Sequence, residues 1–85
     1  GGTNQKHITR YKEQVIEIAS YLILKESSSP KDIKAYTKIL KTASILQKNY
    51  DNYFVRVSRG IYKVNDDKVE DILKYKKLLE SGIKN

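Results

Sequence analysis

Two short runs rich in aromatic and β-branched residues, separated by a glycine turn, most constrain the fold of this 85-residue chain. The runs cover residues 53–57 and 61–64, and Ser58, Arg59 and Gly60 lie between them. This composition favours strands, and Gly60 can take the positive φ that a tight hairpin turn requires. A two-stranded hairpin is only marginally stable by itself. The rest of the chain must therefore provide the elements on which it packs.

Apolar spacing and capping residues predict two helices before the hairpin. The first covers residues 8–26, where one helix face is apolar: Tyr11, Val15, Ile18, Ala19 and Leu22. The second covers residues 30–37, with Ser29 as its N-cap and Pro30 in its first turn. Ile33 is expected to face inward in this helix, together with Tyr36 or Ala35. Ile39 or Leu40 is expected to fill the corner that follows it.

A third, short helix is predicted over residues 42–50, with Thr42 as its N-cap. The expected inward face consists of Ala43, Leu46 and Tyr50, and the expected outward face of Thr42, Ser44, Gln47, Lys48 and Asp51. Small side chains at a helix start, followed by amide and ammonium groups, suit insertion into the major groove of DNA, because the early residues must approach base edges closely. A plain solvated helix face has the same pattern.

Residues 66–81 predict a fourth helix. Asp66 or Asp67 is expected to cap it, and Gly82 is expected to follow its C-terminus. Its apolar stripe consists of Val69, Ile72, Leu73 and Leu79, with Lys76 interrupting it. Such a stripe either packs on the other helices or forms a homodimer with a second copy of the chain, and both alternatives stay open.

Positive charge is concentrated in the middle of the chain. The formal net charge is +7. Residues 31–65 contain 8 Lys and Arg against 2 Asp and Glu, whereas residues 66–85 contain 5 of each kind. This local excess favours a polyanionic partner, either nucleic acid or an anionic membrane surface. A lysine-rich surface that only keeps a protein soluble has a similar composition.

The composition argues against several kinds of chemistry. The chain has no Cys and one His, His7, so thiolate metal sites and Ser-His or Cys-His catalytic pairs lack residues. Its Asp and Glu residues fall at helix ends or on helix faces, and no Asp…Glu-x-Lys strand pattern is present. We therefore expect no enzyme, no cofactor and no metal site. No apolar run approaches the ~20 residues of a membrane span, and no signal peptide is evident, so we expect a cytoplasmic protein, nucleoid-associated when bound.

Together these elements predict an α+β, mostly helical fold of the winged helix-turn-helix type, with a three-helix core, a two-stranded basic wing and an extra C-terminal helix. The winged-helix domain would span residues 8–65, after a flexible tail at 1–7 and before a C-terminal helix within 66–85. The expected function is binding of double-stranded DNA, with helix 42–50 in the major groove and wing 56–63 on the backbone or in the minor groove. The candidate DNA-binding residues are Lys41, Thr42, Ser44, Gln47, Lys48, Arg56, Ser58, Arg59 and Lys63.

The hairpin and the helix before it also carry a family pattern. The hairpin contains R-V-x-R-G-x-Y from Arg56 to Tyr62, preceded by Phe54, and the helix part is represented by Ala43, Ser44, Ile45, Leu46 and Asn49. Residues 30–64 thereby resemble the winged-helix domain appended to PD-(D/E)XK-nuclease-like bacterial proteins and to some restriction-type enzymes. Residues 51–53 depart from that pattern, which has a Gly-Trp-like pair there, and Val64 replaces a leucine. The resemblance implies a DNA-binding module belonging to, or accompanying, a nuclease, and does not imply that this chain is itself the nuclease.

Two broader interpretations stay open. The module could belong to a transcriptional regulator or to a nuclease-associated, restriction-modification protein. A winged helix can also mediate protein–protein interaction or dimerisation without binding DNA, and the composition of 7 Tyr and 1 Phe suits an interface. Binding of RNA is a further variant of the leading interpretation.

Overall fold

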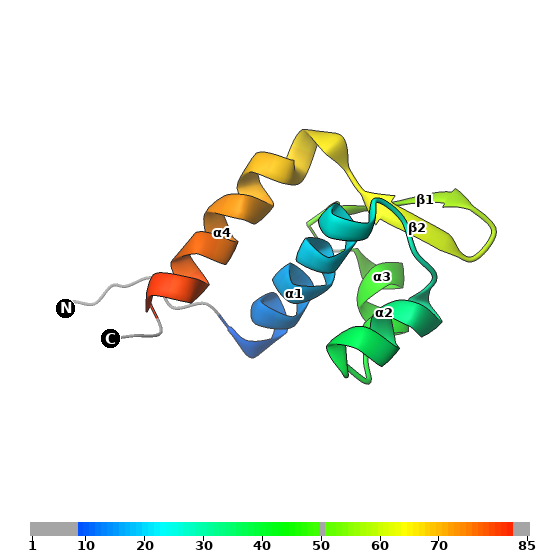
Figure 1. The fold of residues 1–85 in the computed structure, drawn as a ribbon, viewed down its shortest axis with the longest axis horizontal. Helices are drawn as coiled ribbons and strands as arrows, with labels where there is room; N and C mark the ends of the chain where they lie inside the picture. Colours follow the sequence, from blue (N-terminus) through cyan, green and yellow to red (C-terminus); the bar gives the residue numbers. More distant parts are fainter. Residues whose placement is uncertain (1–8, 50, 83–85) are drawn as a thin grey trace.

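The computed structural model describes residues 9–49 and 51–82. The predicted tail, residues 1–7, and Tyr50 lie outside the described residues. The elements follow one another in the order shown in Figure 1: α1 (Arg10–Lys25), α2 (Pro30–Thr37), α3 (Thr42–Lys48), β1 (Phe54–Ser58), β2 (Ile61–Val64), a 3-10 turn η1 (Asp66–Lys68) and α4 (Val69–Gly82).

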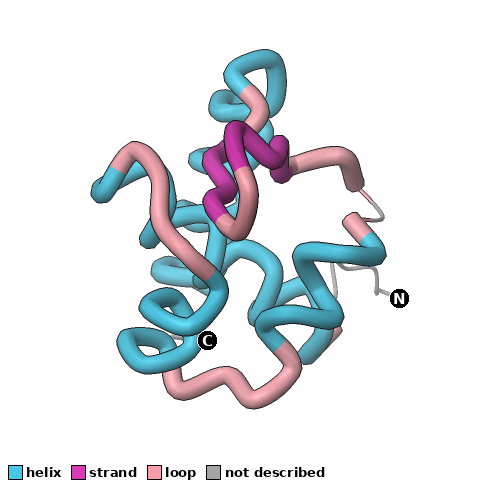
Figure 2. The backbone as a smooth tube through the Cα atoms, turned by 90° about the vertical axis from the view of Figure 1, so that its right-hand side faces the viewer, coloured by secondary structure: helices cyan, strands magenta, loops and turns pink. Residues whose placement is uncertain are grey.

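The fold is α+β and mostly helical, with a winged-helix-like arrangement, as predicted. Helices α1, α2 and α3 pack together, the hairpin lies at one end of them, and α4 runs beside α1 (Figure 1). The apolar core draws on all of these elements, and its fully buried members include Ile18, Ile33 and Ile72. Viewed from the hairpin end, the strands lie in the foreground with α3 beside them (Figure 2).

The link between α1 and α2 also contacts the hairpin. Ser28 and Tyr62 exchange both backbone hydrogen bonds, with N···O distances of 3.0 and 2.9 Å. The α1–α2 connection therefore adds a one-residue edge to β2, a pairing that the sequence did not reveal because a single Ser carries no strand signal. This contact fixes the hairpin against the helical core.

Helix α2 begins as predicted but buries a different face. The Ser29 hydroxyl accepts a hydrogen bond from the Asp32 amide at 3.2 Å, and Pro30 is the first helical residue. The expectation that Tyr36 or Ala35 faces inward is wrong, because both are exposed, whereas Thr37 is buried. The Thr37 hydroxyl donates to the Ile33 carbonyl at 2.8 Å, so its polar group is satisfied in the core. Ile39 fills the following corner, and Leu40 is exposed.

Helix α3 is shorter than predicted and is rotated relative to the expected phase. Thr42 is its first residue and not its N-cap, a position that Lys41 occupies without a side-chain hydrogen bond. The buried face consists of Thr42, Ile45 and Leu46, and Ala43 is exposed. The phase follows from the Ile39 corner, because the Thr42 hydroxyl donates to the Ile39 carbonyl at 2.7 Å and is drawn into the core.

The hairpin has the predicted strands and a two-residue turn. Phe54 pairs with Val64 and Ser58 with Ile61, and a register shift leaves Val57 as a bulge. Gly60 in the turn has φ of +71°, the conformation for which glycine was predicted there. Phe54 in the first strand is buried, as is Tyr53 just before it, while Val55 and Val57 are exposed.

Helix α4 packs on α1. The Asn65 side chain, and not Asp66 or Asp67, caps the η1 turn by accepting from the Asp67 amide at 3.0 Å. Ile72 is fully buried, and Gly82 is the last helical residue and does not follow the helix. The first of the two expected roles, packing on the other helices, is thus observed, and dimerisation stays a prediction.

Asn49 joins the end of α3 to the start of β1. It adopts the left-handed conformation, with φ of 44°, that terminates α3. Its Oδ1 accepts from the Phe54 amide at 3.0 Å, and its Nδ2 donates to the Phe54 carbonyl at 2.9 Å. The helix and the wing are therefore held at a fixed distance by one side chain.

We predict that Asn49→Ala lowers the free energy of unfolding by about 1–3 kcal/mol, because it leaves two backbone groups of Phe54 without their partner and places a methyl group at positive φ. Asn49→Gly is the matched control, since it deletes the same hydrogen bonds but relieves the backbone strain. Urea denaturation followed by circular dichroism should place Asn49→Gly between Asn49→Ala and the unsubstituted chain. Equal stability of all three chains would contradict the role given to the side chain.

Candidate nucleic-acid interface

Helix α3 and the hairpin bring most of the predicted DNA-binding residues to one end of the molecule (Figures 1 and 2). The exposed members of the predicted set are Lys41, Ser44, Gln47, Lys48, Arg56, Ser58 and Arg59. Ala43, which the sequence placed inside, is exposed on α3 next to Ser44. Because Ala43 has a small side chain, the first turn of α3 presents a surface to which another molecule can approach closely.

Two predicted residues do not fit the expected role. Thr42 was expected to point outward, but none of its surface is accessible, so it positions α3 from within the core. Lys63 is half-buried, and its ammonium group lies 3.4 Å from the Asp66 carboxylate. Asp66 is well exposed, so this ion pair is weak and the ammonium group can exchange its partner for another anion.

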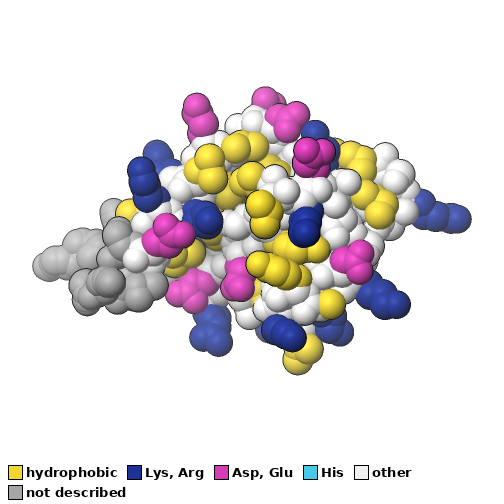
Figure 3. Space-filling model, viewed as in Figure 1, with side chains coloured by type: hydrophobic (Ala, Val, Ile, Leu, Met, Phe, Trp, Pro, Cys, Tyr) yellow, Lys and Arg dark blue, Asp and Glu magenta, His cyan; other side chains and the backbone are white. Residues whose placement is uncertain are grey.

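Four cations of this surface form no ion pair with any described residue: Lys41, Lys48, Arg56 and Arg59. They come from both α3 and the hairpin, so their field covers the space between the two elements. Figure 3 shows Lys and Arg side chains projecting at the right-hand and lower right edges of the molecule, where Figure 1 places the tip of the hairpin and α2 with α3. Solvent-exposed cations that lack internal partners favour a polyanionic ligand.

Asp51, which follows α3 in the chain, forms an ion pair with Lys12 of α1. Its carboxylate lies 2.9 Å from the Lys12 ammonium group, which also donates to the Tyr53 hydroxyl at 3.0 Å. The same ammonium group lies over the rings of Tyr53 and Tyr75, 4.7 and 4.4 Å from their centres. Asp51 was expected to share the outward face of α3, but it follows the helix and pairs with α1. Its charge therefore subtracts little from the field of the basic surface.

Burial and hydrogen bonding together set the pKa values in this network. Burial alone would lower the pKa of Lys12, but hydrogen bonds to Tyr53 and Asp51 outweigh it and raise the pKa above 10.5. Burial raises the pKa of Tyr53 to about 12, with Asp71, which accepts from the Tyr53 hydroxyl at 2.7 Å, adding to the rise and Lys12 opposing it. Lys12 therefore stays charged, and Tyr53 neutral, throughout the neutral range.

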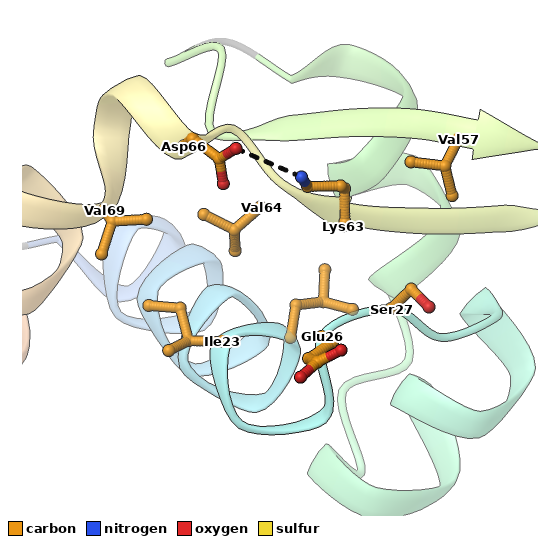
Figure 4. A pocket seen from close by; sticks show the side chains of 9 residues that line it. Ile23, Glu26, Ser27, Val57, Lys63, Val64, Asp66 and Val69 are labelled. Carbon is orange, nitrogen blue, oxygen red and sulfur yellow. Dashed lines mark hydrogen bonds and ion pairs between the residues drawn. The ribbon is translucent and has the colours of Figure 1, made fainter.

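A hollow of about 440 Å³ lies beside the hairpin, between the end of α1 and β2 (Figure 4). Its floor is apolar, with Ile23, Val64 and Val69, and its charged side chains are Glu26, Lys63 and Asp66. Two carboxylates against one ammonium group do not favour a phosphate there. The hollow therefore does not extend the basic surface.

The described part of the chain shows neither a metal site nor a membrane span. Within residues 9–49 and 51–82, no three His, Cys, Asp or Glu side chains lie together so that they could hold a metal ion. None of the described helices is both long and apolar enough to cross a bilayer.

A protein-family model described as "Putative PD-(D/E)XK phosphodiesterase (DUF2161)" matches residues 1–70. The chain belongs to this family. Neither a curated protein nor a solved structure matches the chain significantly. The family match confirms the nuclease-like part of the resemblance seen in the sequence, and nothing in it concerns a winged-helix module.

The family corrects one expectation from the sequence. We expected no enzyme, because the chain lacks an obvious acid–base or metal pattern, but the family is described as a phosphodiesterase. That expectation was wrong because residue patterns within this sequence do not define the activity of the family to which it belongs. The match also favours a nuclease-associated protein over a transcriptional regulator.

We predict that Tyr53→Phe lowers the free energy of unfolding at neutral pH by about 1–2 kcal/mol, because Lys12 and Asp71 lose a shared hydroxyl. A tyrosine whose pKa is raised in the folded state stabilises the fold below the unfolded value of about 10, and this contribution is lost as the pH rises toward 12. Denaturation measured between about pH 8 and 12 should therefore show a smaller loss of stability for Tyr53→Phe than for the unsubstituted chain. Parallel pH profiles for the two chains would contradict the raised pKa.

Proposed function

We propose that this chain binds duplex DNA through α3 and the β1–β2 wing and thereby supplies a substrate-binding surface to a PD-(D/E)XK phosphodiesterase. The proposal rests mainly on four exposed cations at one end of the fold that form no ion pair with any described residue. They are Lys41, Lys48, Arg56 and Arg59. The family description supports a substrate with phosphodiester bonds.

Helix α3 is the part of this surface suited to the major groove. Its exposed first turn carries Ala43 and Ser44, which let the backbone come close to base edges. Gln47, one turn later, has an amide that can pair with an adenine edge, and Lys48 can reach a guanine edge or a phosphate. Thr42 is no longer a candidate contact, because it is buried.

The wing suits the backbone or the minor groove. Arg59 lies in the two-residue turn beside Gly60, and Arg56 and Ser58 are exposed on β1. Guanidinium groups bind phosphates and are attracted to a narrow minor groove. Asn49 fixes β1 to the end of α3, so the wing and the helix would bind as one rigid surface. They would therefore lose little conformational entropy on binding.

We predict that binding to generic duplex DNA weakens steeply with salt. If about four cations meet phosphates, the logarithm of the association constant should fall with the logarithm of salt concentration with a slope of roughly −3 to −4. Fluorescence anisotropy with a labelled duplex at several salt concentrations measures this slope. Weak binding that does not change with salt would contradict the proposal, and a duplex RNA of the same sequence as competitor distinguishes the two nucleic acids.

We further predict a division of roles between the wing and the helix. Arg59→Ala should weaken binding to all duplexes alike, by about five- to tenfold, and should lower the salt slope by about 1. Gln47→Ala should change the preference among duplex sequences instead. Lys74→Ala removes an exposed cation from α4, away from this surface, and should leave binding nearly unchanged. If Arg59→Ala and Lys74→Ala have equal effects, general charge and not the wing determines binding.

A further inference from the structure

A groove runs along the outer side of α1, between α4 and α2. Its part beside α2 is a hollow of about 390 Å³, lined by Tyr21, Leu24, Tyr36 and Leu73 together with Glu17, Ser20, Ile23 and Lys76. A second hollow, of about 370 Å³, continues it and shares Glu17, Ser20 and Lys76. No residue of α3, β1 or β2 lines either hollow, so the groove is separate from the proposed DNA surface.

Large apolar side chains from several helices are exposed in the groove. Leu24 is 71% exposed, Tyr36 63% and Leu73 46%, and they come from three different helices. The Tyr21 and Tyr36 rings lie with centres 4.6 Å apart and form one wall. Figure 3 shows apolar side chains gathered near the middle of the molecule, where α1 runs, with both acidic and basic side chains among them. Contiguous apolar surface with a charged rim is typical of a docking site.

The α1 side of this groove is acidic although the chain as a whole carries +7, and its α4 side continues into a hollow lined by Lys74, Lys76 and Lys77. Glu13, Glu17 and Glu80 line it against one cation, Lys76, which lies 3.7 Å from the Glu80 carboxylate. Glu13 and Glu17 stand four residues apart on α1 and form no ion pair with any described residue. Like charges at this helical spacing repel each other and destabilise the helix slightly. A cation that enters the groove relieves this repulsion.

We propose that the groove docks an amphipathic helix of a partner protein, with Lys or Arg along the edge of its apolar stripe. Apolar side chains of the partner at i, i+3, i+4 and i+7 cover Leu24, Tyr36 and Leu73, as in helix-in-groove recognition. Its cations meet Glu13 and Glu17. The part of α1 that lines the groove, from Glu13 to Leu24, is about 18 Å long, enough for a partner helix of about three turns. A second copy aligned α1 against α1 would place Glu13 and Glu17 against themselves, so charge complementarity at this edge favours a basic partner over self-association.

The test uses two labelled synthetic helical peptides of about five turns. Both carry Leu at the i, i+3, i+4, i+7 positions, and one has Lys and the other Glu at the flanking positions. We expect the Lys peptide to bind at least tenfold more tightly by fluorescence anisotropy and to shift the amide resonances of α1 and α4. Equal binding of the two peptides, or shifts confined to α3 and the wing, would overturn the proposal.

Exposed residues allow matched variants that do not disturb the core. Leu24→Ser should weaken binding of the Lys peptide about tenfold. Leu40→Ser changes another exposed leucine, which lies outside the groove, and should leave binding of the Lys peptide unchanged. Glu17→Lys should weaken the Lys peptide several-fold and strengthen the Glu peptide, and Glu70→Lys, outside both hollows, should do neither. Equal effects within either pair overturn the proposal. So does a concentration-dependent dimer in sedimentation equilibrium that Leu24→Ser abolishes, because a second copy would then fill the groove.

Discussion

The hydrogen-bonded cluster around the Lys12 ammonium group connects parts of the chain that are far apart in sequence. Lys12 lies on α1, Asp51 and Tyr53 lie just before β1, and Tyr53 continues the chain of hydrogen bonds to Asp71 on α4. A half-buried lysine loses part of its hydration, and the pairing of its donors offsets this cost. The partners of Lys12 belong to different parts of the chain. The Lys12 cluster therefore connects α1 both to α4 and to the segment before β1.

The same cluster shapes the electrostatics of the surface. Asp51 pairs inward with Lys12, and Lys41, Lys48, Arg56 and Arg59 form no ion pair with any described residue. The acidic side chains of α1 point instead into the groove on the outer side of that helix. Charge is thus separated between two faces, one suited to a polyanion and the other to a basic partner.

The sequence predicted the elements well because each has a strong local signal. Ser29 with Pro30 marked the start of α2, and Gly60 marked the turn of the hairpin, since capping and positive φ are properties of single residues. Errors arose where tertiary contacts set the phase of a short helix. Thr42 has the composition of an N-cap, but its hydroxyl bonds to the Ile39 carbonyl and rotates α3 so that Ala43 is exposed. Seven residues provide too little periodicity to define that phase.

The candidate surface could be predicted only in part for a related physical reason. Which residues are charged is written in the sequence, but which of them lack a partner depends on contacts between distant segments. Nothing in the sequence alone distinguishes Lys63 from Lys12. In the structure Lys63 lies beside Asp66, whereas Lys12 lies between α1, α4 and the segment before β1. The exposed Lys and Arg of α3 and the wing differ from both, because no described acid competes for them. The availability of these cations, and not the total charge of +7, is what makes this end of the fold the better candidate for nucleic acid.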